Sequence, residues 1–262
     1  PGLSPSPLAS PVPVAGAADA SDAAAAVQRV LTRVEILTGR GFASRPECEV
    51  LDAAAWGARC RERFAQRMRP STLHGLQTVL RALGAVPAEV DLPAVWQDWA
   101  TPPSGAYYDS ARDTIVVHLG ETEPLRDHGE VVRAALLALR AESIDLTPLD
   151  APDASLLSDR ARAFECLAEG EARYWTRRYG MRFSAELADE FVGRANAEWT
   201  HETRPLAPPQ VPAFVVATST FTADAGERLV EALRDAGGEV ALEKAWRLPP
   251  RSTEQVLWPE KI

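Results

Sequence analysis

Histidines and carboxylates are the side chains that could bind a metal or move a proton, and their spacing in this chain favours neither task. The four histidines are His74, His118, His128 and His201. His128 and Glu130 lie two residues apart, and residues at that spacing do not share a helix face. His118 ends an expected strand and His128 begins an expected helix, so these two could be neighbours. We expect the histidines to lie partly exposed at the ends of helices and strands.

Residues 131–146 read VVRAALLALRAESIDL and have the apolar spacing of an amphipathic helix. This segment resembles the active helix of a family of zinc metallopeptidases, whose pattern is roughly (L/V)-A-H-E-L-x-H-A-L-Q-D-Q-x-x-D-L. In that pattern two histidines share one zinc ion and the glutamate activates a water molecule. The matching positions here hold Arg133, Ala134 and Leu137. Arginine offers no lone pair, leucine cannot ligate and alanine cannot act as a base, so the resemblance implies a lost zinc site.

The end of the chain carries the most specific part of this resemblance. Residues 249–262 read PPRSTEQVLWPEKI, which is similar to the family's closing motif P-P-x-S-T-E-Q-I-L-H-P-x-K-Y. Ser252 and Gln255 have the spacing of a helix capping box. Trp258 stands where the family has histidine and Ile262 where it has tyrosine. We interpret Trp258 as a polar position facing the site that has become apolar.

Three internal segments add to the resemblance, which covers residues 27–262. Residues 105–109 (GAYYD) resemble a G-F-Y-D strand before the active helix. Residues 167–172 (LAEGEA) resemble an L-x-E-G-x-A motif whose glutamate, Glu169 here, is implied to supply the third zinc ligand. Residues 223–238 resemble a Y-x-x-G-x-x-F-V … G-G segment without its tyrosine. The resemblance implies a mainly α (α+β), zincin-like fold with a small sheet or hairpin before the former active helix.

A retained Glu169 without its metal needs a cationic partner, because a buried lone charge is expensive. We predict that Arg133 pairs with Glu169 and so replaces the metal as a link between two helices. The alternatives are that both side chains point to solvent, or that Glu169 pairs with Arg173 one helical turn away. We expect the former cleft to be formed or supported by seven residues: Tyr108, Arg133, Glu169, Ser252, Glu254, Gln255 and Trp258.

Composition narrows the classes of partner. The chain has 262 residues, 46% of them hydrophobic, and a net charge of −9, which argues against nucleic acid. No apolar run reaches the roughly 20 residues of a membrane span. Lys244 and Lys261 are the only lysines, a bias typical of a GC-rich genome. The chain has no G-x-S-x-G elbow, phosphate-binding loop or dinucleotide motif, so we expect no metal or other cofactor.

Residues 1–20 are rich in Pro, Ala and Ser and have no period, so we expect a flexible tether before a single domain at 21–262. Such a segment often follows a removed signal peptide or lipid-attachment site, which favours an exported protein; part of it could be an expression remnant. Cys48, Cys60 and Cys166 form no C-x-x-C pair and leave open one disulfide or three thiols.

Apolar periodicity and capping residues predict a mostly helical chain. Expected strands cover 47–51, 105–109 and 114–119, the last two as a hairpin. Expected helices cover 22–38, 52–68, 71–84, 92–99, 131–146, 159–179, 184–202, 211–220, 224–236 and 240–246. Residues 205–212 are Pro-rich and predict a loop. The seven tryptophans mostly have core spacing; a Trp-lined groove for a peptide or glycan is the alternative.

Three functions fit these observations. The first is a catalytically inactive, metallopeptidase-like protein that binds a peptide or protein through the retained cleft. The second is an active hydrolase that uses other residues, around His128, Glu165 and Glu169. The third is an envelope assembly or scaffold factor held by its N-terminal segment. The loss at Arg133, Ala134 and Leu137 favours the first, and we expect no enzymatic activity.

Overall fold

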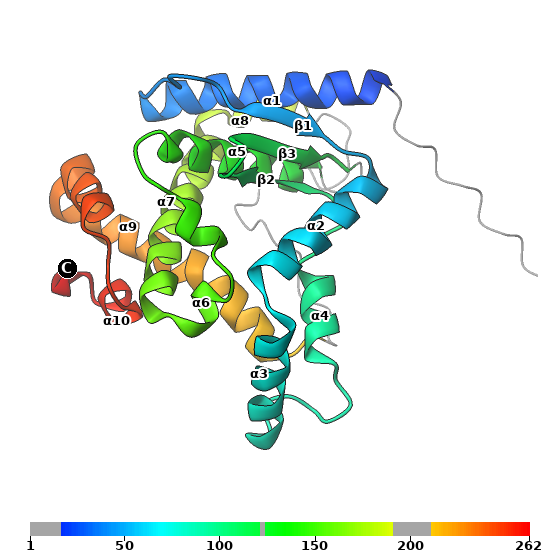
Figure 1. The fold of residues 1–262 in the computed structure, drawn as a ribbon. Coiled ribbons are helices and arrows are strands. Elements are labelled where there is room, and N and C mark those ends of the chain that lie inside the picture. Colours follow the sequence, from blue (N-terminus) through cyan, green and yellow to red (C-terminus); the bar gives the residue numbers. More distant parts are fainter. Residues whose placement is uncertain (1–16, 121–123, 191–210) are drawn as a thin grey trace, which may run out of the picture.

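The computed structural model describes residues 17–120, 124–190 and 211–262 (Figure 1). Within these ranges the protein is mainly helical and has one small three-stranded sheet. The helices and strands are, in chain order, α1 (Ala17–Thr38), β1 (Glu47–Val50), α2 (Ala53–Arg67), α3 (Pro70–Ala82), α4 (Leu92–Trp99), β2 (Gly105–Asp109), β3 (Thr114–His118), α5 (Pro124–Ala141), η1 (Thr147–Asp150), α6 (Ala154–Leu157), α7 (Asp159–Arg182), α8 (Ser184–Glu190), α9 (Ala213–Arg247), α10 (Thr253–Leu257) and η2 (Pro259–Lys261).

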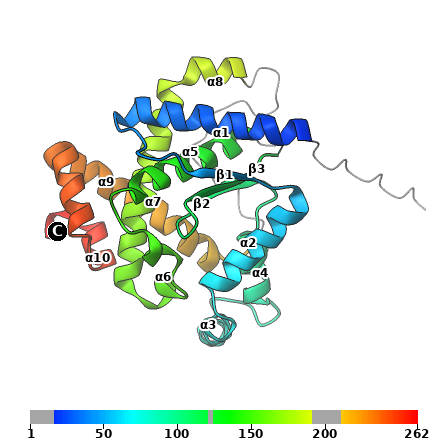
Figure 2. The same ribbon diagram turned by 45° about the horizontal axis from the view of Figure 1, so that its top comes forward.

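The sheet has the strand order β1-β3-β2, with β3 in the centre. β3 runs antiparallel to β2, which confirms the predicted hairpin, and parallel to β1. The two edge strands differ in surroundings, since helix α1 lies along β1 while β2 lies next to α5 (Figures 1 and 2).

Side chains alternate across the sheet and divide its two faces between different helices. Ala106 and Tyr108 of β2 belong to the main core, together with the buried faces of α1, α5, α7 and α9. Tyr107 belongs to a smaller cluster on the other face, where it packs with Trp56 and Cys60 of α2. The uninterrupted apolar runs of the hairpin therefore reflect strands that are buried on both faces.

Helices α7 and α9 cross at the closest approach in the described part of the fold, and two glycines make it possible. A Cβ atom added to Gly170 would lie 2.1 Å from the carbonyl carbon of Gly226. A Cβ atom on Gly226 would lie 1.9 Å from the carbonyl oxygen of Cys166. Gly170 belongs to the LAEGEA segment and Gly226 to residues 223–238, so one helix crossing explains a glycine in each.

Helices α2, α3 and α4 form an arm that projects away from the sheet (Figure 1). The inner side of the arm has its own apolar cluster, which meets the start of α9 through Val215 and Phe214. Asp153 stabilises the turn between α2 and α3. Its carboxylate accepts hydrogen bonds from the main-chain N–H of Arg69 at 2.8 Å and from the hydroxyl of Thr72 at 2.7 Å. Asp153 itself has a left-handed backbone, with φ of 57°.

Several predicted boundaries are wrong. The helix over 131–146 is α5 and ends at Ala141, since residues 142–146 turn into η1. Ser71 does not cap α3; Arg69 is the N-cap and Pro70 takes the first turn, where its missing N–H costs nothing. The three helices predicted between 211 and 246 are one, α9, although the predicted break at Gly237 and Gly238 is present as a kink.

The N-terminal boundary also differs, because α1 begins at Ala17, inside the predicted tether of residues 1–20. The rest of the tether, residues 1–16, lies outside the described residues. So do the second half of the helix predicted over 184–202 and most of the Pro-rich loop at 205–212. The predicted caps at Asp52 and Ser252 are present, and each side chain accepts a main-chain N–H of its helix.

Candidate functional site

A groove of about 700 Å³ lies between the arm and the body of the protein. Helices α2 and α4 and residues 100–104 line the arm side, while α5, α7 and the first turns of α9 line the body side. Strand β2 borders the same groove. The walls combine aromatic rings with paired charges, and cavities of this size and mixed polarity are typical of binding sites.

Among the described residues, no strand pairs with the edge of β2 that faces away from β3. The carbonyl of Val117 accepts the N–H of Leu51 at 2.8 Å, so the odd-numbered residues of β3 turn their main-chain groups towards β1. The even-numbered residues of β3 bond β2, where odd-numbered residues stand opposite them. Ala106 and Tyr108 consequently direct their N–H and C=O groups to the outer edge, and none of the residues that the structure describes bonds them.

Arg133 lies in the groove between two carboxylates. Its Nη1 is 2.7 Å and 2.8 Å from the two carboxylate oxygens of Glu169, and its Nε donates to Glu130 at 3.0 Å. Burial alone would lower the pKa of Arg133, but the charges of Glu169 and Glu130 outweigh it and raise the pKa. The guanidinium is therefore permanently charged and held in one position.

The predicted ion pair between Arg133 and Glu169 is confirmed, and it links α5 to α7. The local alternative with Arg173 is wrong, because Arg173 pairs with Asp224 and Glu227 of α9. A cation thus lies between the two helices that carry these residues.

The other two altered positions have different surroundings. Leu137 lines the groove, one helical turn from Arg133. Ala134 is 0% exposed and lies in the main core among α1, α5 and α7. The position that the resemblance aligns with the catalytic glutamate therefore points away from the groove.

A second arginine-rich part of the groove was missed by sequence reasoning. Arg63 of α2 stacks over the ring of Tyr107 at 4.4 Å and donates to Asp150 at 3.2 Å. Arg67 lies one turn further along α2 and pairs with Glu165 at 3.1 Å. The i, i+4 spacing of Arg63 and Arg67 was the available signal, but their acidic partners lie about 90 residues away in the sequence.

Of the other predicted cleft residues, Tyr108 does line the groove, and its hydroxyl donates to Asp113 at 2.9 Å. The C-terminal residues do not. Ser252 caps α10, and Gln255 accepts the N–H of Arg251 rather than closing the predicted capping box. The C-terminal motif thus forms α10, which packs the end of the chain against α7 and α9.

Trp258 is the clearest correction among these residues. Its side chain does not line the groove; the residue is 49% exposed, and the ammonium of Lys261 lies over its ring at 5.1 Å. Lys261 also pairs with Glu254. The interpretation of Trp258 as a position that faces a former site is therefore wrong.

His74, His118 and His128 do not line this groove, and His201 lies outside the described residues. His118 contacts the carbonyl of Leu51 through Nδ1 at 2.9 Å. His128 is buried against Tyr179, with 3.1 Å between Nε2 and the hydroxyl, which corrects the expectation of partial exposure. Burial lowers the pKa of His128 to about 4. Across the described ranges, no three or more His, Cys, Asp or Glu side chains form a cluster suited to a metal ion.

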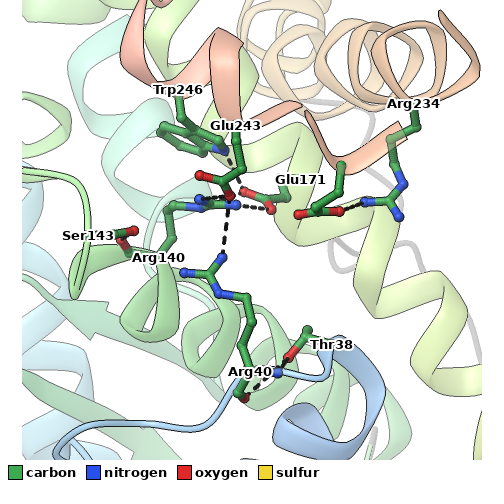
Figure 3. A network of polar contacts seen from close by, with 9 residues as sticks. Thr38, Arg40, Arg140, Ser143, Glu171, Arg234, Glu243 and Trp246 are labelled. Carbon is green, nitrogen blue, oxygen red and sulfur yellow. Dashed lines mark hydrogen bonds and ion pairs between the residues drawn. The ribbon is translucent and has the colours of Figure 1, made fainter. Parts of the chain in front are cut away.

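A buried network at the C-terminal end of α5 was also missed (Figure 3). Arg140, 3% exposed, donates to Glu171 at 2.5 Å and 3.0 Å and to Glu243 at 2.6 Å. The indole N–H of Trp246 donates to Glu171 at 2.7 Å. This network ties α5, α7 and α9 together behind the groove.

The three cysteines are free thiols. Burial raises the pKa of Cys60 to about 11 and that of Cys166 to about 12, so both stay protonated at neutral pH. They pack as small apolar side chains, and Cys60 contributes to the wall of the groove.

Comparison with family models, with curated proteins and with solved structures finds no match to this chain. In the described part of the chain, no helix has the length and apolar character needed to cross a membrane. The resemblance to zinc metallopeptidases therefore rests on the sequence motifs alone.

Proposed function

We propose that this protein is a non-catalytic, metallopeptidase-like binding protein that holds an extended peptide segment in the groove, paired with strand β2. The observation that carries the proposal is the unpaired outer edge of β2 within a groove of about 700 Å³. Ala106 and Tyr108 present two N–H and two C=O groups in strand geometry. A peptide that adds a strand satisfies such groups by main-chain hydrogen bonds, and neighbouring pockets then select its side chains.

The groove offers some aromatic surface for those side chains. Trp99 and Phe64 are half-buried in its wall, while Trp56 and Trp96 line it at only 2% and 4% exposure. Aromatic rings contribute contact area at small entropic cost, which suits a site that reads a flexible ligand. The tryptophans thus serve both the core and the groove.

The non-catalytic part of the proposal rests on Arg133. A guanidinium held between Glu130 and Glu169 repels a metal cation and offers no base. Binding without cleavage is the activity that remains for such a groove. We further propose, from the Pro/Ala/Ser-rich segment at residues 1–20, that the protein acts outside the cytoplasm.

The direct test is affinity selection from a solution library of random hexapeptides, with retained peptides identified by mass spectrometry. We expect retained peptides of intact mass. Ala106→Pro removes an outward N–H from β2 and should weaken binding about five-fold, the effect of one lost hydrogen bond of roughly 1 kcal/mol. Valine has a side-chain volume similar to that of proline but keeps the main-chain N–H, so Ala106→Val serves as the control.

A scan of the ligand separates strand pairing from other modes. N-methylation at each position of a retained peptide should weaken binding at every second residue, because alternate N–H groups face β2. A uniform effect, or equal binding by Ala106→Pro and Ala106→Val, would refute the pairing with β2. Cleaved peptides would show that the groove is catalytic.

A further inference from the structure

Arg63 differs from the other arginines of the groove in how it is held. The Cζ of its guanidinium lies over the ring of Tyr107, a residue of β2, 4.4 Å from the ring centroid. Its Nη2 donates to one oxygen of Asp150 at 3.2 Å. A stacked guanidinium is fixed in orientation while its remaining N–H groups keep their directions. Arg63 is thus a rigid donor placed beside the unpaired strand.

The negative charge next to Arg63 is shared. Asp150 is the one carboxylate in the described part of the chain within ion-pair distance of Arg63. The same carboxylate lies 4.0 Å from Arg67 and accepts the hydroxyl of Ser110 at 3.0 Å. Asp150 therefore serves Arg63 and a hydroxyl, while Arg67 has its closer partner in Glu165 at 3.1 Å.

The electrostatic field at Arg63 reflects the fact that Asp150 is its single acidic partner among the described residues. Burial and the charges of Arg67 and Arg133 lower the pKa of Arg63, and the opposing effect of Asp150 does not restore it. Arg133, by contrast, has two carboxylates and a raised pKa. An arginine cannot discharge by losing its proton, and a further anion beside Arg63 would relieve the field.

We propose that Arg63, supported by Arg67, anchors a carboxylate of the peptide that lies along β2. This inference rests on the proposed function and names the chemistry that the groove selects. The planar fork of a guanidinium matches a carboxylate in two hydrogen bonds, and the ring of Tyr107 holds the fork next to the bound strand. The carboxylate is an Asp or Glu side chain or the C-terminal carboxylate of the ligand.

The test compares four hexapeptide libraries in the same affinity selection: with or without Asp and Glu, each with a free or an amidated C-terminus. We expect at least ten-fold more retained peptide from carboxylate-bearing libraries. Dependence on Asp and Glu would assign a side chain, and dependence on the free terminus would assign the C-terminal carboxylate.

Variants of the protein then assign the anchor. Arg63→Gln should weaken binding of a selected acidic peptide roughly 10- to 100-fold, the size of a lost charge-assisted hydrogen-bonded pair, and should abolish the preference for carboxylates. Arg61→Gln is the matched control: it removes the same charge two residues earlier on α2, from an exposed side chain outside the groove.

The outcomes separate the two proposals. Equal retention of all four libraries, or an unchanged preference in Arg63→Gln, would overturn the carboxylate anchor and leave the peptide groove standing. Equal losses of affinity in Arg63→Gln and Arg61→Gln would show that only net charge matters and would overturn the anchor as well. Retention of no peptide from any library would overturn the proposed function and the anchor together.

Discussion

Gly170 and Gly226 meet where α7 crosses α9, at a distance that leaves no room for a side chain on either. The obstacle to a Cβ atom on Gly170 is main chain, at 2.1 Å, and main chain cannot rotate out of the way. Since Glu169 of α7 and the first turns of α9 line the same body-side wall, this crossing holds that wall of the groove together.

Gly170→Ala should therefore lower the free energy of unfolding by about 3 kcal/mol or more, the upper range of overpacking, because the two helices must move apart. Urea titration followed by circular dichroism measures the change. The control is Gly75→Ala on α3, where an added Cβ meets nothing within 4 Å. That variant should gain about 0.5–1 kcal/mol from helix propensity. Equal stability of the two variants would contradict the close crossing.

Restoring the metallopeptidase residues should not restore a tight zinc site. In Arg133→His/Ala134→Glu/Leu137→His, the new glutamate enters a core position that is 0% exposed. Burying that carboxylate without a partner should cost several kcal/mol of stability. We expect weak zinc binding at most, measured as metal content by mass spectrometry. The double variant without Ala134→Glu separates ligand loss from unfolding, and stoichiometric zinc in the triple variant would contradict this placement of Ala134.

Acid should destabilise the protein through His128. Burial, together with the charges of Arg33 and Arg29, lowers the pKa of His128 to about 4 against the opposing charge of Glu190. The unfolded chain takes up a proton near pH 6.5, before the folded protein does, so stability falls as the pH drops from about 6.5 to about 4. The loss should be about 3 kcal/mol.

The measurement is the free energy of unfolding from urea titrations at several pH values. His128→Gln keeps a neutral polar group next to Tyr179 and should remove most of the slope between pH 6.5 and 4. An identical slope in the variant would assign the acid sensitivity to other groups.

Arg140 should be among the most costly charges to remove. Arg140→Met leaves Glu171 buried without its cation, and breaking a buried ion pair in this way costs about 3–5 kcal/mol (Figure 3). Arg45→Met removes an exposed arginine that pairs with Glu35, so its cost should stay below about 1 kcal/mol. Differential scanning calorimetry of both variants measures the contrast, and similar melting temperatures would contradict a structural role for the buried network.

Local patterns in the sequence were sufficient for the hairpin, most helices and the caps at Asp52 and Ser252. These features depend on residues within a few positions of one another, where the period of two or of 3.6 and the capping side chains act directly. The absence of ligating side chains at Arg133 and Leu137 is equally local, since it depends only on residue type.

The role of each charged residue depended on contacts that local patterns do not contain. From the sequence, Glu169 could pair with Arg133 on another helix or with Arg173 on the same helix. The packing of α5 on α7 brings Arg133 to Glu169, while Arg173 pairs with Asp224. The C-terminal motif matched the family best and yet Trp258 lies away from the groove.

The sequence by itself determined a mainly helical chain with one hairpin and without the zinc-binding residues of the family it resembles. Only the tertiary structure decided that the outer edge of β2 opens into a groove, that Arg63 meets Asp150 there, and that Ala134 points into the core. The physical reason is that secondary structure follows from neighbouring residues. A groove and its charges arise where helices distant in sequence pack together.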